Sequence, residues 1–374
     1  MSSDWLTTPP RPLVLGGAPL TAVGRLRVYV CGVTPYDVTH LGHAATFIWA
    51  DAADRVLRWA GHRVTVARNV TDVDEALSDE AARRGVDATM LAALQRASFE
   101  STMTTLRVRN PDASPTAAQA VGHVIQLAAA LLVRDAAYER DGTVYVRAAD
   151  AARRAGLDHD TAVRVAAEYR DQPDDPRKDD PLDVAVWRAA DASGGGARWP
   201  SPWGEGRPGW HAGCAAMVLS QFGPSVDLHC GGADLAFPHH ATETVMAEAA
   251  TGVAPFARAW LRAGTVGVDG RKMAKSTGNL VLVDDLLADW PVAVIRLHVL
   301  HRPWSAGWDF DPADLEVTAS TLDALYSAAA KPGGGTAPVT ELLLDDLDVP
   351  AAVAAATEAG GPAARELVDV LGLA

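Results

Sequence analysis

A strand, a turn, a helix and a second strand follow one another near the start of the chain, and this unit limits the folds open to it. Residues 25–32 (RLRVYVCG) alternate apolar and polar side chains as a strand does. Apolar residues then recur every three or four positions from Leu41 to Trp59, which predicts one helical face, and Gly61 ends the helix. Residues 63–72 (RVTVARNVTD) predict the next strand. The sequence therefore predicts a βαβ unit and an α/β fold with a parallel sheet.

The alternation of strands and helices resumes only after a long interruption. Residues 73–133 are Ala-rich and predicted to be largely helical, and a short strand is predicted at 143–147. From Gly209 onward the patterns predict a helix at 211–222, a strand at 226–229 and a helix at 238–250. We therefore expect a split sheet domain with these parts: an N-terminal extension at 1–24, the two halves of the sheet domain at 25–72 and 197–279, an insertion at 73–196, a helical stem at 280–330, and a linker with a small helical tail at 331–374.

Composition excludes several classes of protein. The chain has 374 residues and no apolar run near the length needed to span a bilayer, and its first residues lack the features of a secretory signal, so we expect a cytoplasmic protein. The net charge is −14, with 47 acidic against 33 basic residues, which disfavours a large RNA partner such as tRNA. The residues do not determine the oligomeric state, and we take a monomer as the expectation.

Two of the three cysteines lie in distinctive motifs, together with a histidine. Cys31 lies in YVCGVTPYD, Cys214 ends GWHAGC, and His239 lies in FPHH. Thiolate and imidazole are ligands that Zn²⁺ prefers, and three protein ligands with an open fourth position describe a zinc that binds a further group. Glu243 follows His239 by four residues and shares its face if the segment is helical, so its carboxylate could reach the metal as a ligand or only contact one of the ligands. Cys230 is expected to be a buried apolar residue.

Two further motifs are suited to phosphate. HLGH, at residues 40–43, lies where the first strand leads into its helix, and the helix N-terminus and the imidazoles of His40 and His43 can receive phosphoryl oxygens. KMAKS, at residues 272–276, presents Lys272 and Lys275 on a glycine-flanked loop that can hold a leaving polyphosphate. Each motif alone is weak evidence, because a histidine at a helix start is commonly a cap and a basic loop is commonly only solvated.

Together these motifs resemble the HIGH and KMSKS signatures of class I aminoacyl-tRNA synthetases, from about residue 26 to residue 279. Cys31, Cys214 and His239 resemble the zinc ligands of the cysteine-activating branch. The resemblance implies a Rossmann-type (HUP-type) parallel sheet with a helical insertion and a short helical C-terminal domain. It also implies that one Zn²⁺ per chain binds the thiolate of substrate cysteine. ATP, accompanied by Mg²⁺, would then convert that cysteine to cysteinyl-AMP, with His40, His43, Lys272 and Lys275 stabilising the phosphoryl charge.

Two families share this core: cysteinyl-tRNA synthetases, and the cysteine ligases of mycothiol biosynthesis, which join cysteine to the 2-amine of glucosaminyl-inositol (GlcN-Ins). Residues 34–46 (TPYDVTHLGHAAT) and 278–283 (GNLVLV) are similar to the ligases. Only about a hundred residues follow Lys272, too few for the usual helical bundle together with an anticodon-binding domain. The resemblance therefore predicts a ligase acting on ATP, L-cysteine and GlcN-Ins. Three alternatives stay open: a truncated cysteinyl-tRNA synthetase, a cysteine ligase for another small amine, and a non-catalytic paralogue that binds cysteine or zinc.

The resemblance also assigns contacts to the adenylate and its parts. Contacts with cysteinyl-AMP are expected from Cys31, Gly32, Val33, Thr34, Thr46, Asn69, Val70 and Thr71. Trp210 would form a wall of the amino-acid pocket beside zinc, and the ribose and adenine would be contacted by Gly232, Ala233, Asp234 and Val266. Without the family context, Trp210, Thr46 and Gly232 would equally suit a core aromatic, a helix-face residue and a turn glycine. One departure from the ligases is EYRDQP at residues 168–173, where they carry ERGGDP, which leaves the role of that loop open.

Overall fold

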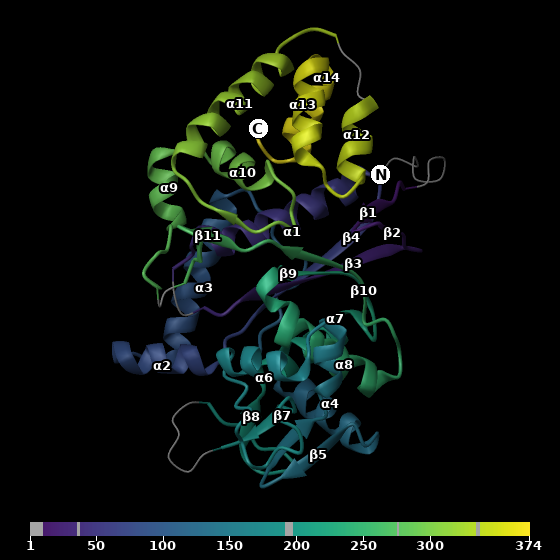
Figure 1. Cartoon of the computed structure of the whole chain (residues 1–374), viewed down its shortest axis with the longest axis vertical. Coiled ribbons are helices and arrows are strands. Elements are labelled where there is room, and N and C mark those ends of the chain that lie inside the picture. The colour runs from purple at the N-terminus through teal and green to yellow at the C-terminus, as the bar shows by residue number, and fades with distance from the viewer. Residues whose placement is uncertain (1–9, 36–37, 191–196, 275–276, 334–336) are drawn as a thin grey trace.

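The computed structural model describes residues 10–35, 38–190, 197–274, 277–333 and 337–374. At its centre is a four-stranded parallel sheet in the order β10-β9-β3-β4 (Figure 1). The strands are β3 (Arg25–Val33), β4 (Arg63–Val70), β9 (Val226–Gly232) and β10 (Ala257–Ala263), and α1 (Leu41–Trp59) connects β3 to β4. The predicted βαβ unit and parallel sheet are confirmed.

The side chains of β3 alternate between the two faces of the sheet. Leu26, Val28 and Val30 pack into the large core that contains α1, whereas Tyr29 and Cys31 belong to a second buried cluster on the other face. This second face is covered by α7 (Trp210–Phe222) and by α8 (Ala241–Thr251), which follows β9 in the sequence. Because successive residues of a strand point to opposite faces, Cys31 lies on the side away from α1.

Between β4 and β9 the chain forms helices and a separate antiparallel sheet of order β5-β6-β7-β8. Its elements are α2 (Glu75–Arg84), α3 (Ala88–Thr105), α4 (Val121–Val133), β5 (Ala137–Arg140), β6 (Thr143–Val146), α5 (Ala149–Arg154), α6 (His159–Glu168), β7 (Val184–Ala189) and β8 (Gly206–Pro208). The fourth strand, β8, lies beyond residue 196, where the sequence patterns place the end of the insertion.

The helical prediction for residues 73–133 is wrong between α3 and α4. There the chain runs extended beside β4, where the N–H of Arg68 donates to the carbonyl of Ala113 at 3.0 Å and that of Val70 to Pro115 at 2.9 Å. Pro111 and Pro115 lack the N–H that a helix interior needs. These prolines are a stronger local signal than the alanine content on which the helical prediction rested.

The rest of the chain adds small sheets and a helical C-terminal part. An N-terminal hairpin comprises β1 (Leu13–Leu15) and β2 (Ala18–Leu20), and after β10 follow β11 (Val266–Val268), β12 (Arg271–Lys272), α9 (Val283–Asp289), α10 (Val292–Leu300), β13 (Trp308–Asp309), α11 (Ala313–Ala329), α12 (Ala337–Leu344), α13 (Val349–Ala359) and α14 (Gly361–Val370). No helix in the described part of the chain is both long and apolar enough to cross a membrane. The division into domains stays a prediction.

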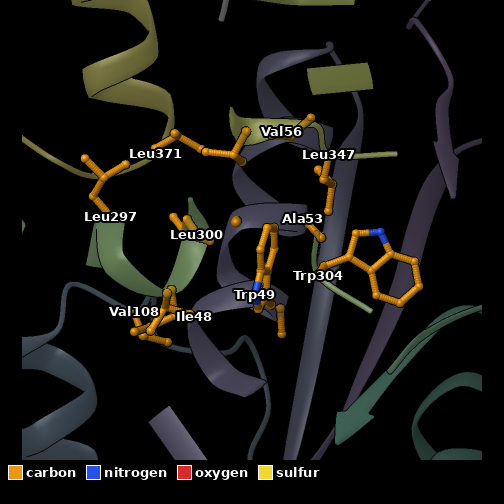
Figure 2. Close-up of a cluster of buried hydrophobic side chains, with 14 of the residues drawn as sticks. Ile48, Trp49, Ala53, Val56, Val108, Leu297, Leu300, Trp304, Leu347 and Leu371 are labelled. Carbon is orange, nitrogen blue, oxygen red and sulfur yellow. The ribbon is translucent and has the colours of Figure 1, made fainter. Parts of the chain in front are cut away.

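The C-terminal helices share one hydrophobic core with α1. Figure 2 shows side chains from α1, α10 and the C-terminal segment in a single cluster that includes Trp49, Leu297 and Leu371. The guanidinium of Arg296 is fully buried; it donates to Asp51 of α1 at 2.6 Å and to the carbonyl of Leu371 at 2.9 Å. Removing one partner of such a buried pair typically costs about 3–5 kcal/mol, so Arg296 joins α10 firmly to α1, and its bond to Leu371 adds the C-terminal segment to the same contact.

The strand order creates a crevice at the carboxyl ends of β3 and β9. β4 pairs with one edge of β3 and β9 with the other, and ligands of open α/β sheets bind where neighbouring connections diverge in this way. The strands approach closely here, because a Cβ at Gly32 would lie 1.6 Å from the carbonyl oxygen of Asn69. Only glycine is therefore compatible with this position of the crevice.

Candidate active site

A cleft of about 810 Å³ opens at these strand ends. Small-molecule sites commonly enclose roughly 300–1,000 Å³. Sixteen of the residues predicted from the sequence line it: Cys31, Gly32, Val33, Thr34, His40, His43, Thr46, Asn69, Thr71, Trp210, Cys214, Gly232, Asp234, His239, Val266 and Lys272. Val70, Ala233 and Glu243 are not part of the lining, and Lys275 lies outside the described residues. Segments far apart in the sequence are thus brought to one cleft.

Four side chains suited to a metal meet at the buried part of the cleft. Cys31 lies near the end of β3, Cys214 lies on α7, His239 lies in a π-helical turn (Ala236–His240) and Glu243 lies in the first turn of α8. All four are buried, and one ligand atom of each lies within 4.8 Å of the others. The helix predicted from residue 238 begins only at residue 241, yet His239 Nε2 still lies 2.7 Å from Glu243 Oε1. Two sulfurs, an imidazole and a carboxylate are a donor set that fits Zn²⁺.

The charges of this cluster compensate one another. A hydrogen bond from Cys31 lowers the pKa of Cys214 to about 6, and His239 lowers it further, whereas burial acts in the opposite direction. Burial opposes protonation of His239, but Glu243 and Cys214 raise its pKa to about 10. Burial likewise opposes ionisation of Glu243, but His239 and His229 lower the pKa of Glu243 well below its usual range. Burial and Cys214 raise the pKa of the Cys31 thiol. The cluster therefore holds buried anions. A metal cation can neutralise them by taking the place of the protons on His239 and Cys31.

A second layer of polar groups, which the sequence patterns did not indicate, surrounds these four. His211 Nδ1 lies 2.7 Å from His239 Nδ1, and His211 Nε2 lies 3.1 Å from both carboxylate oxygens of Asp171. His229 Nε2 lies 3.0 Å from Glu243 Oε2. A signal for His211 exists, because it precedes Cys214 by three positions and so shares a helical face with it. His229 could be found only from the register of β3 and β9.

Cys230 and His240 lie outside the four-residue cluster. Cys230 is fully buried with the core on the α1 side, and burial raises the pKa of its thiol, in agreement with the expected apolar role. The His240 ring lies 5.0 Å from that of His229, and Arg262 Nε donates to its Nδ1 at 3.3 Å. His240 thus packs behind His229.

The part of the cleft at the start of α1 has a different character. His40 is the N-cap residue of α1, the first turn of the helix contains no acidic residue, and the His40 and His43 rings lie 3.8 Å apart. Lys272 Nζ forms an ion pair of 2.6 Å with Asp234 Oδ2. Burial opposes protonation of Lys272, but Asp234 raises its pKa. A helix N-terminus flanked by imidazoles and an ammonium group suits an anion.

The floor of the cleft is held by short polar contacts. Asn69 Oδ1 accepts from the N–H of Gly32 at 2.8 Å, and Asn69 Nδ2 donates to Thr71 Oγ1 at 3.2 Å. A Cβ at Gly232 would lie 2.4 Å from Asp234 Oδ1, so the backbone there also comes close to its neighbours. Asn69 therefore orients the ends of β3 and β4, and its amide keeps one acceptor and one donor position beyond these two bonds.

Comparison with known proteins places this geometry in a family. The family model for the class I (C) tRNA synthetase catalytic domain matches residues 19–320. A protein of Parafrankia sp. (strain EAN1pec), named L-cysteine:1D-myo-inositol 2-amino-2-deoxy-alpha-D-glucopyranoside ligase, is 43% identical over 339 residues, which cover 88% of this chain and 76% of the relative. Proteins of the same name from Nocardia farcinica (41% identity, 92% and 89% coverage) and Mycobacterium ulcerans (42%, 88% and 82%) are similarly close. The chain belongs to this ligase family.

Solved structures of synthetases share the fold of this chain. Mycobacterium tuberculosis methionyl-tRNA synthetase in complex with methionyl-adenylate has a TM-score of 0.63 and 17% identity, covering 94% of this chain and 82% of that one. A putative arginyl tRNA synthetase from Campylobacter jejuni has a TM-score of 0.55 and 14% identity, covering 99% and 88%. The predicted class I synthetase-like fold is confirmed.

An aromatic wall stands beside His239 in this member of the ligase family. The Trp210 ring stacks on His239 with centroids 4.3 Å apart, and the Tyr169 ring stacks on Trp210 at 6.1 Å. The hydroxyl of Tyr169 donates to the carbonyl of Asp234 at 3.0 Å. Tyr169 belongs to residues 168–173 (EYRDQP), and Glu168 and Arg170 of the same segment line the cleft, so this loop lies against it.

Proposed function

We propose that this enzyme activates L-cysteine with ATP and joins it to the 2-amine of GlcN-Ins, a step of mycothiol biosynthesis. The observation that carries the proposal is one cleft with two chemistries: the buried cluster of Cys31, Cys214, His239 and Glu243, and the cationic start of α1. The names of relatives at 41–43% identity describe the same cysteine ligase reaction.

Cys31, Cys214 and His239 would hold Zn²⁺, with Glu243 as a fourth ligand. When bound, zinc supplies a soft Lewis acid whose preference for thiolate separates cysteine from serine by ligand chemistry instead of shape. Trp210 would hold the His239 ring in place by stacking and keep water from the amino-acid pocket. The fit of the donor set supports this assignment.

The first step joins cysteine to AMP. The carboxylate of cysteine attacks the α-phosphorus of ATP, the bond to the bridging oxygen of the β-phosphate breaks, and pyrophosphate leaves. Mg²⁺, when bound with ATP, would neutralise part of the phosphate charge. His40 and His43 donate to the phosphoryl oxygens at the N-terminus of α1, while Lys272, together with Lys275, neutralises the departing pyrophosphate. These groups act by position and charge, and none needs to remove a proton.

The second step forms the amide. The neutral amine attacks the carbonyl carbon of cysteinyl-AMP, the bond between that carbon and the phosphate oxygen breaks, AMP leaves, and the proton lost from the amine passes to solvent. We assign the remaining adenylate contacts to Gly32, Val33, Thr34, Thr46, Asn69, Val70, Thr71, Trp210, Gly232, Ala233, Asp234 and Val266. Of these, Val70 and Ala233 do not line the cleft, so their assignment rests on the family resemblance alone.

We also infer a monomeric enzyme of a reducing compartment, the cytoplasm. All three cysteines are unpaired and buried, and two of them belong to the proposed zinc site. Such use of cysteine suits a compartment in which thiols stay reduced.

Identification of the acceptor tests the proposal. The zinc-loaded enzyme is incubated with ATP, cysteine and either GlcN-Ins or tRNA, and AMP release and the mass of the product are measured. We expect rapid AMP release and a cysteinyl-GlcN-Ins product with the sugar, and no charging of tRNA. The His123→Ala variant, altered at an exposed residue of α4, should behave like the parent enzyme. Charging of tRNA with indifference to the sugar would overturn the proposal.

A further inference from the structure

A carboxylate and two imidazoles lie in series behind the proposed zinc site. Asp171 contacts His211 Nε2 through both carboxylate oxygens at 3.1 Å, and His211 Nδ1 contacts His239 Nδ1 at 2.7 Å. His211 is fully buried, and the Asp171 side chain is 9% exposed. The series ends at a residue whose other ring nitrogen, Nε2, faces the metal cluster, 2.7 Å from Glu243.

Only one arrangement of protons satisfies this series when His239 Nε2 is a metal ligand. A neutral imidazole carries its proton on the nitrogen that does not bind the metal, so His239 Nδ1 is the donor of the 2.7 Å contact. His211 Nδ1 must then accept, which places the proton of His211 on Nε2. That N–H points at the Asp171 carboxylate. A carboxylate forms a stronger hydrogen bond with an N–H donor than a neutral side chain does.

The backbone around Asp171 is arranged to hold the carboxylate in place. The residues on either side, Arg170 and Gln172, have φ values of 64° and 52°, a left-handed conformation that is costly for residues other than glycine. Lys178 Nζ donates to the carbonyl of Asp171 at 2.5 Å, and Arg188 donates to the Gln172 side chain at 2.9 Å. Such conformations persist where surrounding contacts hold them, and these contacts fix the loop that carries Asp171.

We propose that Asp171 is a positioning residue for the metal in this chain. Through His211 it holds the proton of His239 on Nδ1, fixes the orientation of that ring and leaves Nε2 free for zinc. The inference rests on the proposed zinc site and adds to it a determinant of zinc affinity.

The test compares zinc affinities among variants of the full chain. Dissociation constants are measured by competition with a chelator for the parent, Asp171→Ala, Asp171→Asn and the control Asp174→Asn, which changes an exposed residue of the same loop. Loss of a group that orients a ligand commonly weakens metal binding about 10- to 100-fold, which we expect for Asp171→Ala. Asp171→Asn keeps the shape and a neutral acceptor, so its loss should be smaller, and Asp174→Asn should stay within about twofold of the parent, as surface changes usually do.

A second measurement separates positioning from loop stability. Nitrogen-15 NMR of the zinc-loaded protein reports which ring nitrogen of His239 carries the proton. We expect a protonated Nδ1 in the parent and in Asp174→Asn, with altered nitrogen shifts for the His211 and His239 rings in Asp171→Asn, a variant of nearly unchanged shape. Asp171 variants with parental zinc affinity and unchanged histidine shifts would overturn the inference while leaving the zinc site intact. A parent chain that binds no zinc would instead overturn the zinc site itself, and this inference with it.

Discussion

The two parts of the cleft are built in contrasting ways. Around His239 the four possible ligands are at most 3% exposed, and each ionised group is balanced by its neighbours. At the start of α1, the Lys272 side chain is 52% exposed and His43 is exposed, and charge is supplied by a helix end and one half-exposed ion pair. The first part is a buried set of mutually balanced donors, whereas the second presents its charges to solvent.

This contrast has a consequence for function. A pre-arranged donor set selects one functional group, and its members act together, so loss of one should remove most of the activity. In a part of the cleft that is open to solvent, each charged group would stabilise the phosphates of ATP separately. Removing one group there should therefore lower the activity only in part. Substitutions in the two parts of the cleft should therefore differ both in size and in what else they change.

The largest effect is expected from Cys214→Ser. The low pKa of this thiol makes it an anionic donor near neutral pH, and a serine hydroxyl cannot replace it. Cysteine-dependent exchange of pyrophosphate into ATP should fall by about 10³-fold or more, as when one member of a unit is lost, and bound zinc measured by mass spectrometry of metals should disappear. Cys230→Ala, at a buried cysteine outside the cluster, should keep its zinc. Full zinc content in Cys214→Ser would contradict the ligand assignment.

His40→Ala should impair catalysis without disturbing zinc. Loss of one donor to a charged transition state commonly lowers kcat by about 10²- to 10³-fold, and we expect that range for pyrophosphate exchange. The KM for cysteine and the zinc content should stay near parental values, since His40 lies at the N-cap of α1 and not in the metal cluster. His123→Ala serves as the control. Loss of zinc from His40→Ala would mean that the two parts of the cleft are not independent.

Lys272→Met should have an intermediate effect on ATP. A hydrogen bond to a charged group is worth about 1.5–3 kcal/mol, so kcat/KM for ATP should fall by about 10- to 100-fold. The Lys272–Asp234 pair is half exposed, and the free energy of unfolding should change by less than about 1 kcal/mol, which thermal or urea unfolding measures. Lys331→Met, at an exposed lysine, provides the comparison. Parental kinetics in Lys272→Met would remove this residue from the mechanism.

The smallest effect is expected from Trp210→Phe. Phenylalanine keeps part of the stacking on His239, and aromatic pairs contribute about 0.5–1.5 kcal/mol beyond burial, so the KM for cysteine should rise roughly 2- to 10-fold. The KM for ATP and the zinc content should not change, which steady-state kinetics and metal analysis would show. A larger change in the KM for ATP than in the KM for cysteine would mean that Trp210 contributes to the ATP site and not to the amino-acid pocket.

The parts of this site that the sequence predicted are those encoded in local patterns. Cys31 follows the alternating residues of β3, and HLGH lies where the strand leads into α1, so the fold class and the main candidates could be recognised from adjacent residues. The helical prediction failed between α3 and α4, where prolines outweigh alanine content.

The remaining residues depend on contacts that no local pattern encodes. His229 meets Glu243 because β9 pairs with β3 in one register, which places His229 opposite Tyr29. Asp171 reaches His211 from a loop whose left-handed residues are not glycines, so the usual signal for that backbone is missing. Such residues become visible only when the chain is folded.

Discrimination between cysteine and serine shows whether one part of the cleft selects the amino acid while the other activates it. Exchange of pyrophosphate into ATP is measured with each amino acid, before and after removal of zinc by a chelator. We expect exchange with cysteine to exceed that with serine by about 10⁴-fold or more, as in sites that require one polar group of the substrate, and to vanish without zinc and return with it. Exchange that persists without zinc, or that serine supports equally well, would contradict the account.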